Sequence, residues 1–416
     1  MNPQSLLRAL FDKAVEVADP MRSLAAHLPI KPAGRVVVIG AGKASARMAE
    51  AVEAVWGPCE GLVITRYGYG RPCQGIKIVE AAHPVPDAAG AAATAEMLAL
   101  LGELGEGDFV LALISGGASA LLVAPVDGVS LAEKQAVNAA LLACGAPIAQ
   151  MNTVRKHLSR VKGGQLAAAA YPARVLALMI SDVPGDDMAF IGSGPTVGDA
   201  STPADALAIL AHWGANVPAS ALAALAQPTG VITPYDKRLS HTTNHIYAAP
   251  AQSLAAAETL AKAQGLRVVM LGDALEGEAR EVAAQMAQTA LQARSTTPVL
   301  LLSGGELTVT RRGDGIGGPN AEFCLALALA LNGASGIHAI ACDTDGVDGA
   351  AEVAGAVIGP DTLAKAKAAG VDPALALSRN DAHNFFAAIG DQVVTGPTLT
   401  NVNDFRAILV LPKIQL

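Results

Sequence analysis

The chain contains 416 residues, of which 52% are hydrophobic and 16% are charged, and its formal net charge at pH 7 is −8. This composition excludes intrinsic disorder for most of the chain, and the length predicts two or three domains. The acidic balance disfavours a surface for nucleic acid or for an anionic membrane. Five cysteines without CxxC spacing predict a reduced, cytoplasmic protein. Charged residues at the start of the chain argue against a secretory signal, and no apolar run approaches the ~18 residues of a membrane span.

Hydrophobic runs alternate with Ala-rich helical stretches, which predicts an α/β fold with mostly parallel sheets. The expected strands are residues 35–40, 61–66, 108–117, 174–182, 266–273, 298–305 and 337–346. Ligands in open α/β sheets bind at the carboxyl ends of such strands. Clustered Pro, Thr and His between residues 200 and 250 predict a domain boundary at about residue 235. We therefore expect two three-layer α/β/α Rossmann-like domains, residues 1–235 and 236–416, with a ligand site in an interdomain cleft.

The segment VVVIGAGKAS at residues 36–45 predicts a strand, a glycine turn and a helix. Gly40 and Gly42 would let the backbone approach a phosphate. The dinucleotide fingerprint is incomplete, because the third glycine is absent and Thr65 and Arg66 stand where an acidic residue would follow the next strand. Lys43 is the distinctive residue, since a cation at this turn can neutralise a transferring phosphoryl group. The alternative for Lys43 is a solvated lysine in the first turn of a helix.

Two predicted strands are each followed by Ser-Gly-Gly, once in each half of the chain. Such loops offer successive N–H and hydroxyl donors to phosphate or carboxylate oxygens. The alternative is an ordinary tight turn that needs glycine. The candidate nucleotide- and phosphate-binding residues of these loops are Ser115, Gly116, Gly117, Ser303, Gly304, Gly305 and Glu306, and Ser119 supplies a further hydroxyl.

The segment NTVRKHLSRVKGGQL predicts a helix that begins at Asn152 as N-cap and ends at the glycines 163 and 164. At 100° per residue, Arg155, Ser159 and Lys162 would share one cationic face. In an acidic chain, this face is a candidate for binding an anionic substrate. A solvated basic helix face is the alternative.

Acidic residues follow two other predicted strands. Asp182 stands at the end of one strand, and Asp343, Asp345 and Asp348 alternate with glycines after another. Clustered carboxylates fit Mg²⁺ bound jointly with nucleotide phosphates, because Mg²⁺ needs only one or two protein carboxylates. Turns and helix caps are the alternative for each aspartate. The eight histidines have no paired metal-ligand spacing, although His83 and His383 lie in segments that could line a site.

The motifs together resemble the glycerate 2-kinases whose C-terminal part is called the MOFRL domain, a family in which some members are labelled hydroxypyruvate reductase. The resemblance covers most of the chain, through GAGKAS, HPVPD, SGGASALL, NTVRKHLSRVKGGQL, SDVPGDD, GSGPT, SGGELTVT, GGPNAEF, DTDGVDG and TGPTLTNVND. One departure stands out. Kinase members commonly have G-G-R-N-Q-E where this chain has Pro319 and Ala321 in place of the arginine and the glutamine.

The resemblance implies an enzyme that uses ATP and Mg²⁺ to phosphorylate the 2-hydroxyl of D-glycerate. Asp182 would orient or deprotonate the hydroxyl, and Lys43 would stabilise the γ-phosphoryl charge. Arg155, Ser119 and Lys162 would bind the hydroxy-acid, and Asp343 and Asp345 would hold the metal. An NAD(P)H-dependent hydroxypyruvate reductase is one alternative, and a non-catalytic sensor of an organic acid or nucleotide is another. A homodimer also remains open as the assembly.

Overall fold

The computed structural model describes residues 2–349 and 351–412, which form two compact units. The N-terminal unit is Pro20–Tyr247, and the C-terminal unit combines the chain up to Asp19 with the chain from Ala248 onward. The boundary expected at residue 235 therefore lies later, and the first helix belongs to the other unit. The helix α1 (Pro3–Ala18) buries Leu7, Leu10 and Phe11 in the C-terminal unit. Its periodic pattern shows that one face is buried, but no local signal tells which sheet it covers.

The N-terminal unit is built on a six-stranded sheet with the order β3-β2-β1-β4-β5-β6. All described pairs from β3 through β5 are parallel. The strand bounds are β1 (Val36–Ala41), β2 (Glu60–Arg66), β3 (Ile76–Ala81), β4 (Phe109–Ile114), β5 (Arg174–Ile180) and β6 (Thr242–Ala248). From β1, the chain adds β2 and β3 on one side of the sheet. It then returns to the other side of β1, where it adds β4, β5 and β6. The order thus reverses between β1 and β4.

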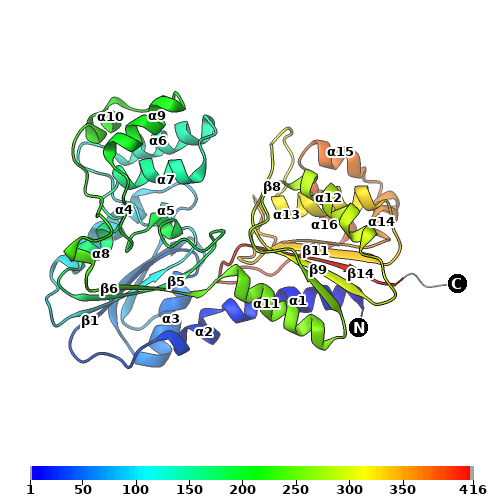
Figure 1. The fold of residues 1–416 in the computed structure, drawn as a ribbon, viewed down its shortest axis with the longest axis horizontal. Coiled ribbons are helices and arrows are strands. Elements are labelled where there is room, and N and C mark those ends of the chain that lie inside the picture. The colour runs from blue at the N-terminus through cyan, green and yellow to red at the C-terminus, as the bar shows by residue number, and fades with distance from the viewer. Residues whose placement is uncertain (1, 350, 413–416) are drawn as a thin grey trace. The chain divides into compact units, whose positions relative to one another are not determined.

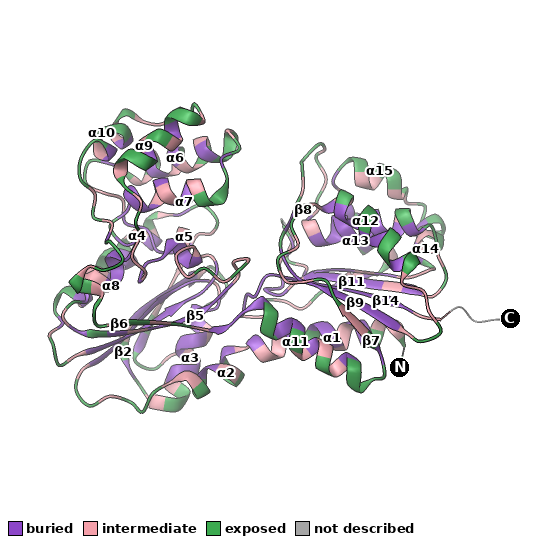
Figure 2. Ribbon diagram, viewed as in Figure 1, coloured by how far each residue is buried: buried purple, intermediate pink, exposed green. Residues whose placement is uncertain are grey.

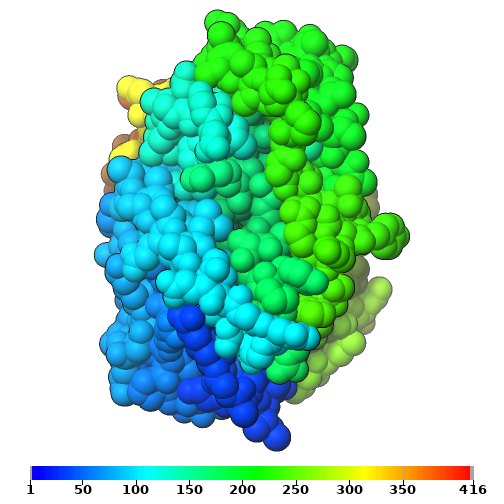
Figure 3. Space-filling view, turned by 90° about the vertical axis from the view of Figure 1, so that its left-hand side faces the viewer, coloured from blue at the N-terminus to red at the C-terminus, as the bar shows by residue number. Residues whose placement is uncertain are grey.

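Helices cover both faces of this sheet (Figure 1). One face carries α3 (Ser45–Trp56), next to the short α2 (Pro20–Ser23) and a 3-10 turn, η1 (Leu24–His27). The other face carries α4 (Ala88–Gly102), α5 (Ala118–Leu121) and α8 (Gln165–Ala169). Four more helices enclose a small apolar core of their own and form the upper part of the unit in Figure 3. They are α6 (Leu131–Ala143), α7 (Ile148–His157), α9 (Pro203–His212) and α10 (Ala219–Leu225). Two further 3-10 turns are η2 (Ile191–Ser193) and η3 (Lys237–Leu239).

The C-terminal unit contains a second six-stranded sheet with the order β13-β12-β11-β14-β9-β7. Its strands are β7 (Arg267–Met270), β9 (Val299–Ser303), β11 (Ile337–Asp343), β12 (Gly355–Ile358), β13 (Gln392–Val393) and β14 (Asp404–Val410). The pair β7–β9 is parallel, as is the small separate pair of β8 (Gly277–Glu278) and β10 (Leu307–Thr308), whereas the other described pairs are antiparallel. The α/β class is confirmed, but antiparallel pairing dominates this sheet. The loop from β11 to β12 is too short for the crossover that parallel strands need.

Helices also cover both faces of the second sheet, so each unit has the three layers expected. One face packs against α1 and α11 (Pro250–Ala263). The other packs against α12 (Ala279–Gln292), α13 (Pro319–Leu331) and α16 (Ala382–Ile389), with α14 (Thr362–Ala369) and α15 (Pro373–Ser378) beside them. Figure 2 shows the strands of both sheets largely buried. Among the described residues, no helix is long and apolar enough to cross a membrane.

Candidate active site at the strand ends of the N-terminal unit

The reversal of strand order brings two loops together, one after β1 and one after β4. The backbone N–H of Lys43 donates to the carbonyl of Gly116 at 2.8 Å. The next N–H, of Ala44, donates to Ser115 Oγ at 3.0 Å. In open α/β sheets, ligands bind outside the carboxyl ends of the strands at this kind of switch point. The candidate site is therefore built on these two loops.

Close approach of the neighbouring strand explains the two glycines near the end of β1. Gly40 lies inside β1, where a Cβ would come within 2.5 Å of the carbonyl oxygen of Leu113. At Gly42, with φ +139°, a Cβ would come within 2.1 Å of Ser115 Oγ. Ser115 is fully buried. Gly40 and Ser115 were expected to contact phosphate, but they hold the strand and the loops together.

The N–H groups of Gly116 and Gly117 are the donors that this pair of loops leaves for a ligand. Within residues 2–349 and 351–412, neither donates to a protein acceptor. Gly117 has φ +85°, and a Cβ there would lie 3.2 Å from Lys43 Cγ. Successive N–H groups in such a turn form a concavity that binds anions. Lys43 lies in the turn before α3 rather than within the helix, and its side chain runs past this concavity.

Ser119 begins a chain of hydrogen-bonded side chains that leads to Arg155. Ser119 Oγ lies 2.8 Å from Ser193 Oγ, which donates to Asn152 Oδ1 at 3.2 Å. Arg155 donates from Nη1 to the same Asn152 oxygen at 3.4 Å and from Nε to Asn138 Oδ1 at 3.0 Å. Burial lowers the pKa of the guanidinium. The sequence indicated Ser119 and Arg155 but missed Ser193, whose left-handed φ of +64° no residue pattern announces.

The expected helix over residues 152–166 is wrong. The helix α7 begins at Ile148 after Pro147 and ends at His157, so Asn152 lies within it rather than at its N-cap. The chain then turns through Gly163 and Gly164, with φ of +57° and +78°, into α8. Pro147 was the missed start signal, because proline often opens a helix. Arg155, Ser159 and Lys162 therefore do not share one helix face.

Lys162 and Lys134 are nevertheless buried near Arg155. Lys162 is 1% exposed and its Nζ donates to the carbonyls of Ser119 and Leu122 at 2.9 and 3.1 Å. Lys134, which the sequence analysis missed, is 3% exposed and its Nζ donates to the carbonyl of Leu158 at 2.8 Å. Burial lowers the pKa of both amines, that of Lys134 to about 7, and neighbouring cations add to the effect. Such burial rules out direct substrate contact for Lys162 in this state. Lys162 instead positions Ser119 through the hydrogen bond to its carbonyl.

Asp182 lies at the same edge of the sheet as the two loops. It stands two residues after β5, which pairs in parallel with β4. Its backbone turn is held by the N–H of Val183, which donates to Ser181 Oγ at 3.3 Å. The side chain is half-buried. Asp182 thus belongs to the strand next to the Gly116–Gly117 loop, as the strand pattern predicted.

The second Ser-Gly-Gly loop, in the C-terminal unit, is fixed by a buried arginine. Arg406 donates from Nη2 to the carbonyls of Gly304 and Gly305 and from Nη1 to Asp404 Oδ2 at 3.0 Å. The N–H of Gly304 donates to the carbonyl of Gly272 at 2.9 Å. Burial raises the pKa of Asp404 to about 7. Gly304 therefore has no N–H to offer to phosphate, and a structural role accounts for it.

Three buried polar atoms around this loop have no hydrogen-bond partner among the described residues. They are Ser303 Oγ, Asn320 Oδ1 and Arg406 Nε. All three side chains are at most 1% exposed. A buried water with several polar neighbours suits such a group of atoms. Glu306, by contrast, is exposed and can reach a ligand.

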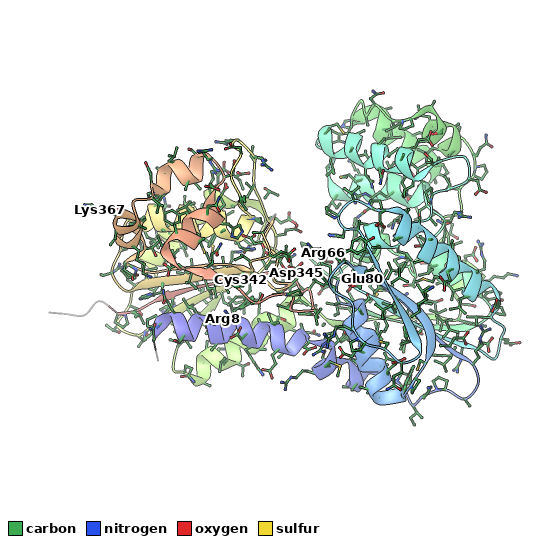
Figure 4. The ribbon with its side chains drawn as sticks, turned by 180° about the vertical axis from the view of Figure 1, so that it is seen from behind. Arg8, Arg66, Glu80, Cys342, Asp345 and Lys367 are labelled. Atoms are coloured by element: carbon green, nitrogen blue, oxygen red, sulfur yellow. The ribbon has the colours of Figure 1, made fainter. Side chains whose placement is uncertain are left out.

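The aspartates after β11 form turns. The N–H of Asp345 donates to Asp343 Oδ1 at 2.9 Å, and the N–H of Val347 donates to Asp345 Oδ1 at 2.8 Å. Asp345 lies in this loop in Figure 4. Within the described ranges, no three His, Cys, Asp or Glu side chains gather as a metal site. The donor set therefore fits a metal that takes most of its ligands from a nucleotide and water, and does not fit a metal held by protein alone.

Pro319, where the family pattern has arginine, is the first residue of α13. The N–H groups of the next two residues, Asn320 and Ala321, donate to the carboxylate of Asp348 at 3.0 and 2.8 Å. His383 Nε2 lies 3.0 Å from Asp348 Oδ2. Asp348 therefore caps this helix, and the start of α13 is closed by protein groups.

Comparisons with known proteins agree on one family. Residues 6–226 match the model described as "Domain of unknown function (DUF4147)", and residues 299–404 match the MOFRL family. The chain is 52% identical over 99% of its length to a protein of Agrobacterium vitis, named "Putative hydroxypyruvate reductase", of which 95% is covered. It is 39% identical over 99% of its length to the D-glycerate 2-kinase of Thermotoga maritima, which is covered completely. The crystal structure of a glycerate kinase from Thermotoga maritima matches 98% of this chain and all of its own with a TM-score of 0.87 at 38% identity.

Proposed function

The chain belongs to the DUF4147–MOFRL family, and we propose that it is a glycerate 2-kinase that transfers the γ-phosphoryl group of ATP to the 2-hydroxyl of D-glycerate. Full-length similarity to named glycerate kinases supports the reaction. The observation that carries the proposal for this chain is the Gly116–Gly117 turn at the switch point, with Lys43 beside it. A phosphoryl group in transfer needs backbone donors and a cation of this kind.

In the proposed reaction, the 2-hydroxyl oxygen attacks the γ-phosphorus and forms the new O–P bond. The bond from that phosphorus to the β–γ bridging oxygen breaks, and ADP leaves. Asp182 accepts the hydroxyl proton. Lys43 and the N–H groups of Gly116 and Gly117 stabilise the charge on the three equatorial phosphoryl oxygens.

Arg155 and Ser119 hold the carboxylate and hydroxyl of the substrate. Support comes from the partly buried guanidinium of Arg155, which has no carboxylate within 4 Å among the described residues and lies near the buried amines of Lys134 and Lys162. Unpaired buried cations are costly, and an anion offsets that cost. A small hydroxy-acid supplies such a charge.

Mg²⁺, when bound, would neutralise negative charge on the phosphates of the nucleotide. Asp343 and Asp345 remain the proposed protein ligands, and Glu306 with Ser303, Gly304 and Gly305 remains a proposed second contact for the nucleotide. Ser303 is buried and the N–H of Gly304 already donates to the carbonyl of Gly272, so Glu306 and Gly305 would make this contact. All five cysteines are free thiols, which supports a cytoplasmic setting.

The test is to incubate the purified chain with D-glycerate and MgATP and to identify the product by ³¹P NMR. We expect 2-phosphoglycerate and ADP in equal amounts, with activity lost on removal of Mg²⁺ by EDTA and restored when Mg²⁺ is added back. Formation of 3-phosphoglycerate would correct the regiochemistry. No ADP beyond the background rate would refute the kinase.

Hydroxypyruvate reductase is the second candidate, because that name belongs to a relative 52% identical to this chain. The strand order of the N-terminal unit is also that of dinucleotide-binding domains. Against it, Arg66, the residue placed to meet a 2′-phosphate, packs on Tyr69 with its Nη1 3.2 Å from the phenol oxygen. Oxidation of NADH or NADPH by hydroxypyruvate without ATP would establish the reductase. A non-catalytic sensor would bind without turnover in either assay.

A further inference from the structure

His83 lies beside the Gly116–Gly117 turn although it follows the outermost strand of the sheet, β3. A Cβ on Gly117 would lie 3.2 Å from His83 Cδ2 and 3.3 Å from His83 Nε2. The same point lies 3.2 Å from Lys43 Cγ. The imidazole and the lysine side chain thus border the space that a side chain on Gly117 would occupy. The ring is half-buried, so it can meet a ligand.

The segment that carries His83 is anchored by contacts that do not use its imidazole. Asp87 caps α4 by accepting from the N–H of Gly90 at 3.0 Å, and it also accepts from Tyr67 Oη at 2.9 Å. Gln135 Nε2 donates to the carbonyl of Pro86 at 2.7 Å. These contacts hold residues 83–87 in place. The ring position is therefore set by its neighbours, and a replacement at 83 leaves the anchors intact.

We propose that His83 is a further catalytic residue, whose Nε2–H donates to an anionic oxygen of the group held by the N–H groups of Gly116 and Gly117, across from Lys43. On the proposed function, this oxygen belongs to the γ-phosphoryl group. The identity of the group thus rests on that function, whereas the contact between the imidazole and an anion does not. Gly117 is glycine both for its positive φ and because a side chain would fill the space between His83 and Lys43.

The kinetic test compares His83→Ala with His83→Gln, whose amide places a donor close to the position of Nε2. His83→Ala should lower kcat about 10²-fold, on the scale of losing one preorganised donor to a developing charge. The KM for D-glycerate should change less than threefold, and His83→Gln should recover at least tenfold of the loss in kcat. His212→Ala, at an exposed histidine of the same unit, is the control and should keep wild-type rates.

Two kinetic outcomes would overturn the proposal. A kcat for His83→Ala within threefold of wild type would show that the imidazole does not contact the reacting group. Equal losses in the Ala and Gln variants would show that the ring supports the loop by its shape. Melting temperatures of the three variants identify a folding defect, in which case the binding measurement below decides.

The binding test separates this proposal from the proposed function. The His83 resonance in the NMR spectrum of wild type is identified as the imidazole signal that is lost in His83→Gln. Its chemical shift is then followed in two separate titrations, one with inorganic phosphate and one with MgATP. We expect the His83 signal to move with either probe in saturable fashion, while the His212 signal stays. If wild type lacks kinase activity but the His83 signal moves, the function fails and the contact stands. An unmoved His83 signal with both probes would refute the contact.

Discussion

Buried charge is handled differently at the N-terminal site and in the C-terminal unit. Around the Gly116–Gly117 turn, Lys134 and Lys162 donate to backbone carbonyls, and within the described ranges neither has a carboxylate within 4 Å. In the C-terminal unit, three buried carboxylates each have a basic neighbour: Asp404 has Arg406, Glu322 has Arg280, and Asp348 lies beside His383. Even within the N-terminal unit, the buried Lys156 pairs with Asp199. The buried lysines without a carboxylate partner thus lie next to the candidate site.

This difference in the pairing of buried charges indicates which unit is suited to bind an anion. Burying a charge without a partner costs several kcal/mol unless its pKa shifts or a counter-ion arrives. The C-terminal unit meets this cost with its own carboxylates, and its charges fix loops such as Gly304–Gly305. We propose that the N-terminal site leaves the counter-ion of Arg155 to the substrate. Variants in the C-terminal unit should therefore lose stability, whereas variants at the N-terminal site should lose activity or substrate affinity.

The largest expected effect is on stability, at the paired charge of the C-terminal unit. Arg406→Leu leaves Asp404 buried without its cation and removes the donors to two carbonyls. The free energy of unfolding should fall by about 3–5 kcal/mol. Urea denaturation followed by circular dichroism measures it, while tryptophan fluorescence follows the N-terminal unit alone, because Trp56 and Trp213 are the chain's two tryptophans.

A double variant checks the cause of that loss. Adding Asp404→Asn removes the stranded carboxylate, so the double variant should recover part of the stability that Arg406→Leu alone loses. A double variant less stable than Arg406→Leu would show that the loss comes from packing and hydrogen bonds rather than from the unpaired charge. Lys162→Met, on the other side of the comparison, strands no carboxylate and should cost only about 1–3 kcal/mol.

The next effect is on catalysis, at Lys43. Lys43→Ala should lower kcat by about 10²-fold, because it removes a preorganised cation from the transferring phosphoryl group. The melting temperature should stay close to that of wild type. Steady-state kinetics at saturating D-glycerate and MgATP measure the loss, with Lys77→Ala as control, since Lys77 pairs with Glu96 on the surface. Wild-type turnover in Lys43→Ala would return Lys43 to the role of a solvated lysine.

A smaller effect is expected on substrate affinity, at Arg155. Arg155→Lys keeps the charge but loses the planar pair of donors, so the KM for D-glycerate should rise about tenfold. The KM for ATP should change less than twofold. Arg160→Lys is the matched control, because the side chain of Arg160 is 51% exposed and Arg160 lies just after the end of α7. Equal rises in both KM values would place Arg155 on the nucleotide.

The seven strands predicted from the sequence are all present because they depend on local signals, whereas β3, β6, β12, β13 and β14 were missed. Buried strands ending in Gly, Ser or Asp placed Lys43, Gly116 and Asp182 at one edge of the sheet, where the structure has them. The roles inside the loops depended on distant contacts and were partly wrong. Whether Ser115 faces a ligand is decided by Ala44 and Ser45, at the start of α3 and about 70 residues earlier in the chain.

Antiparallel pairing in the second sheet and the buried Lys134 were missed for the same reason. Strand direction follows from the length of the connection, and the short β11–β12 loop was predicted to be a metal site instead of a hairpin. Lys134 sits in α6 among alanines and polar residues, and its burial depends on α7 packing over it. Only the fold brings Ser193 and His83 to the switch point, since neither has a distinguishing spacing to Lys43.

The smallest expected effect concerns the pH dependence of stability, at Lys134. Burial lowers its pKa in the folded state to about 7 from its ordinary value of 10.5. Above pH 7 the unfolded chain therefore binds a proton that the folded chain has lost, and the free energy of unfolding rises with pH. Lys134 should add about 1 kcal/mol to stability between pH 7 and pH 8.

In Lys134→Met this contribution disappears, so the variant's tryptophan-detected stability should rise less over that interval than that of wild type. The exposed Lys77→Met should keep the wild-type slope, which separates burial from the loss of any lysine. Equal slopes for wild type and Lys134→Met would mean that Lys134 stays charged in the folded unit, and the N-terminal site would then carry even more positive charge for its anion to balance.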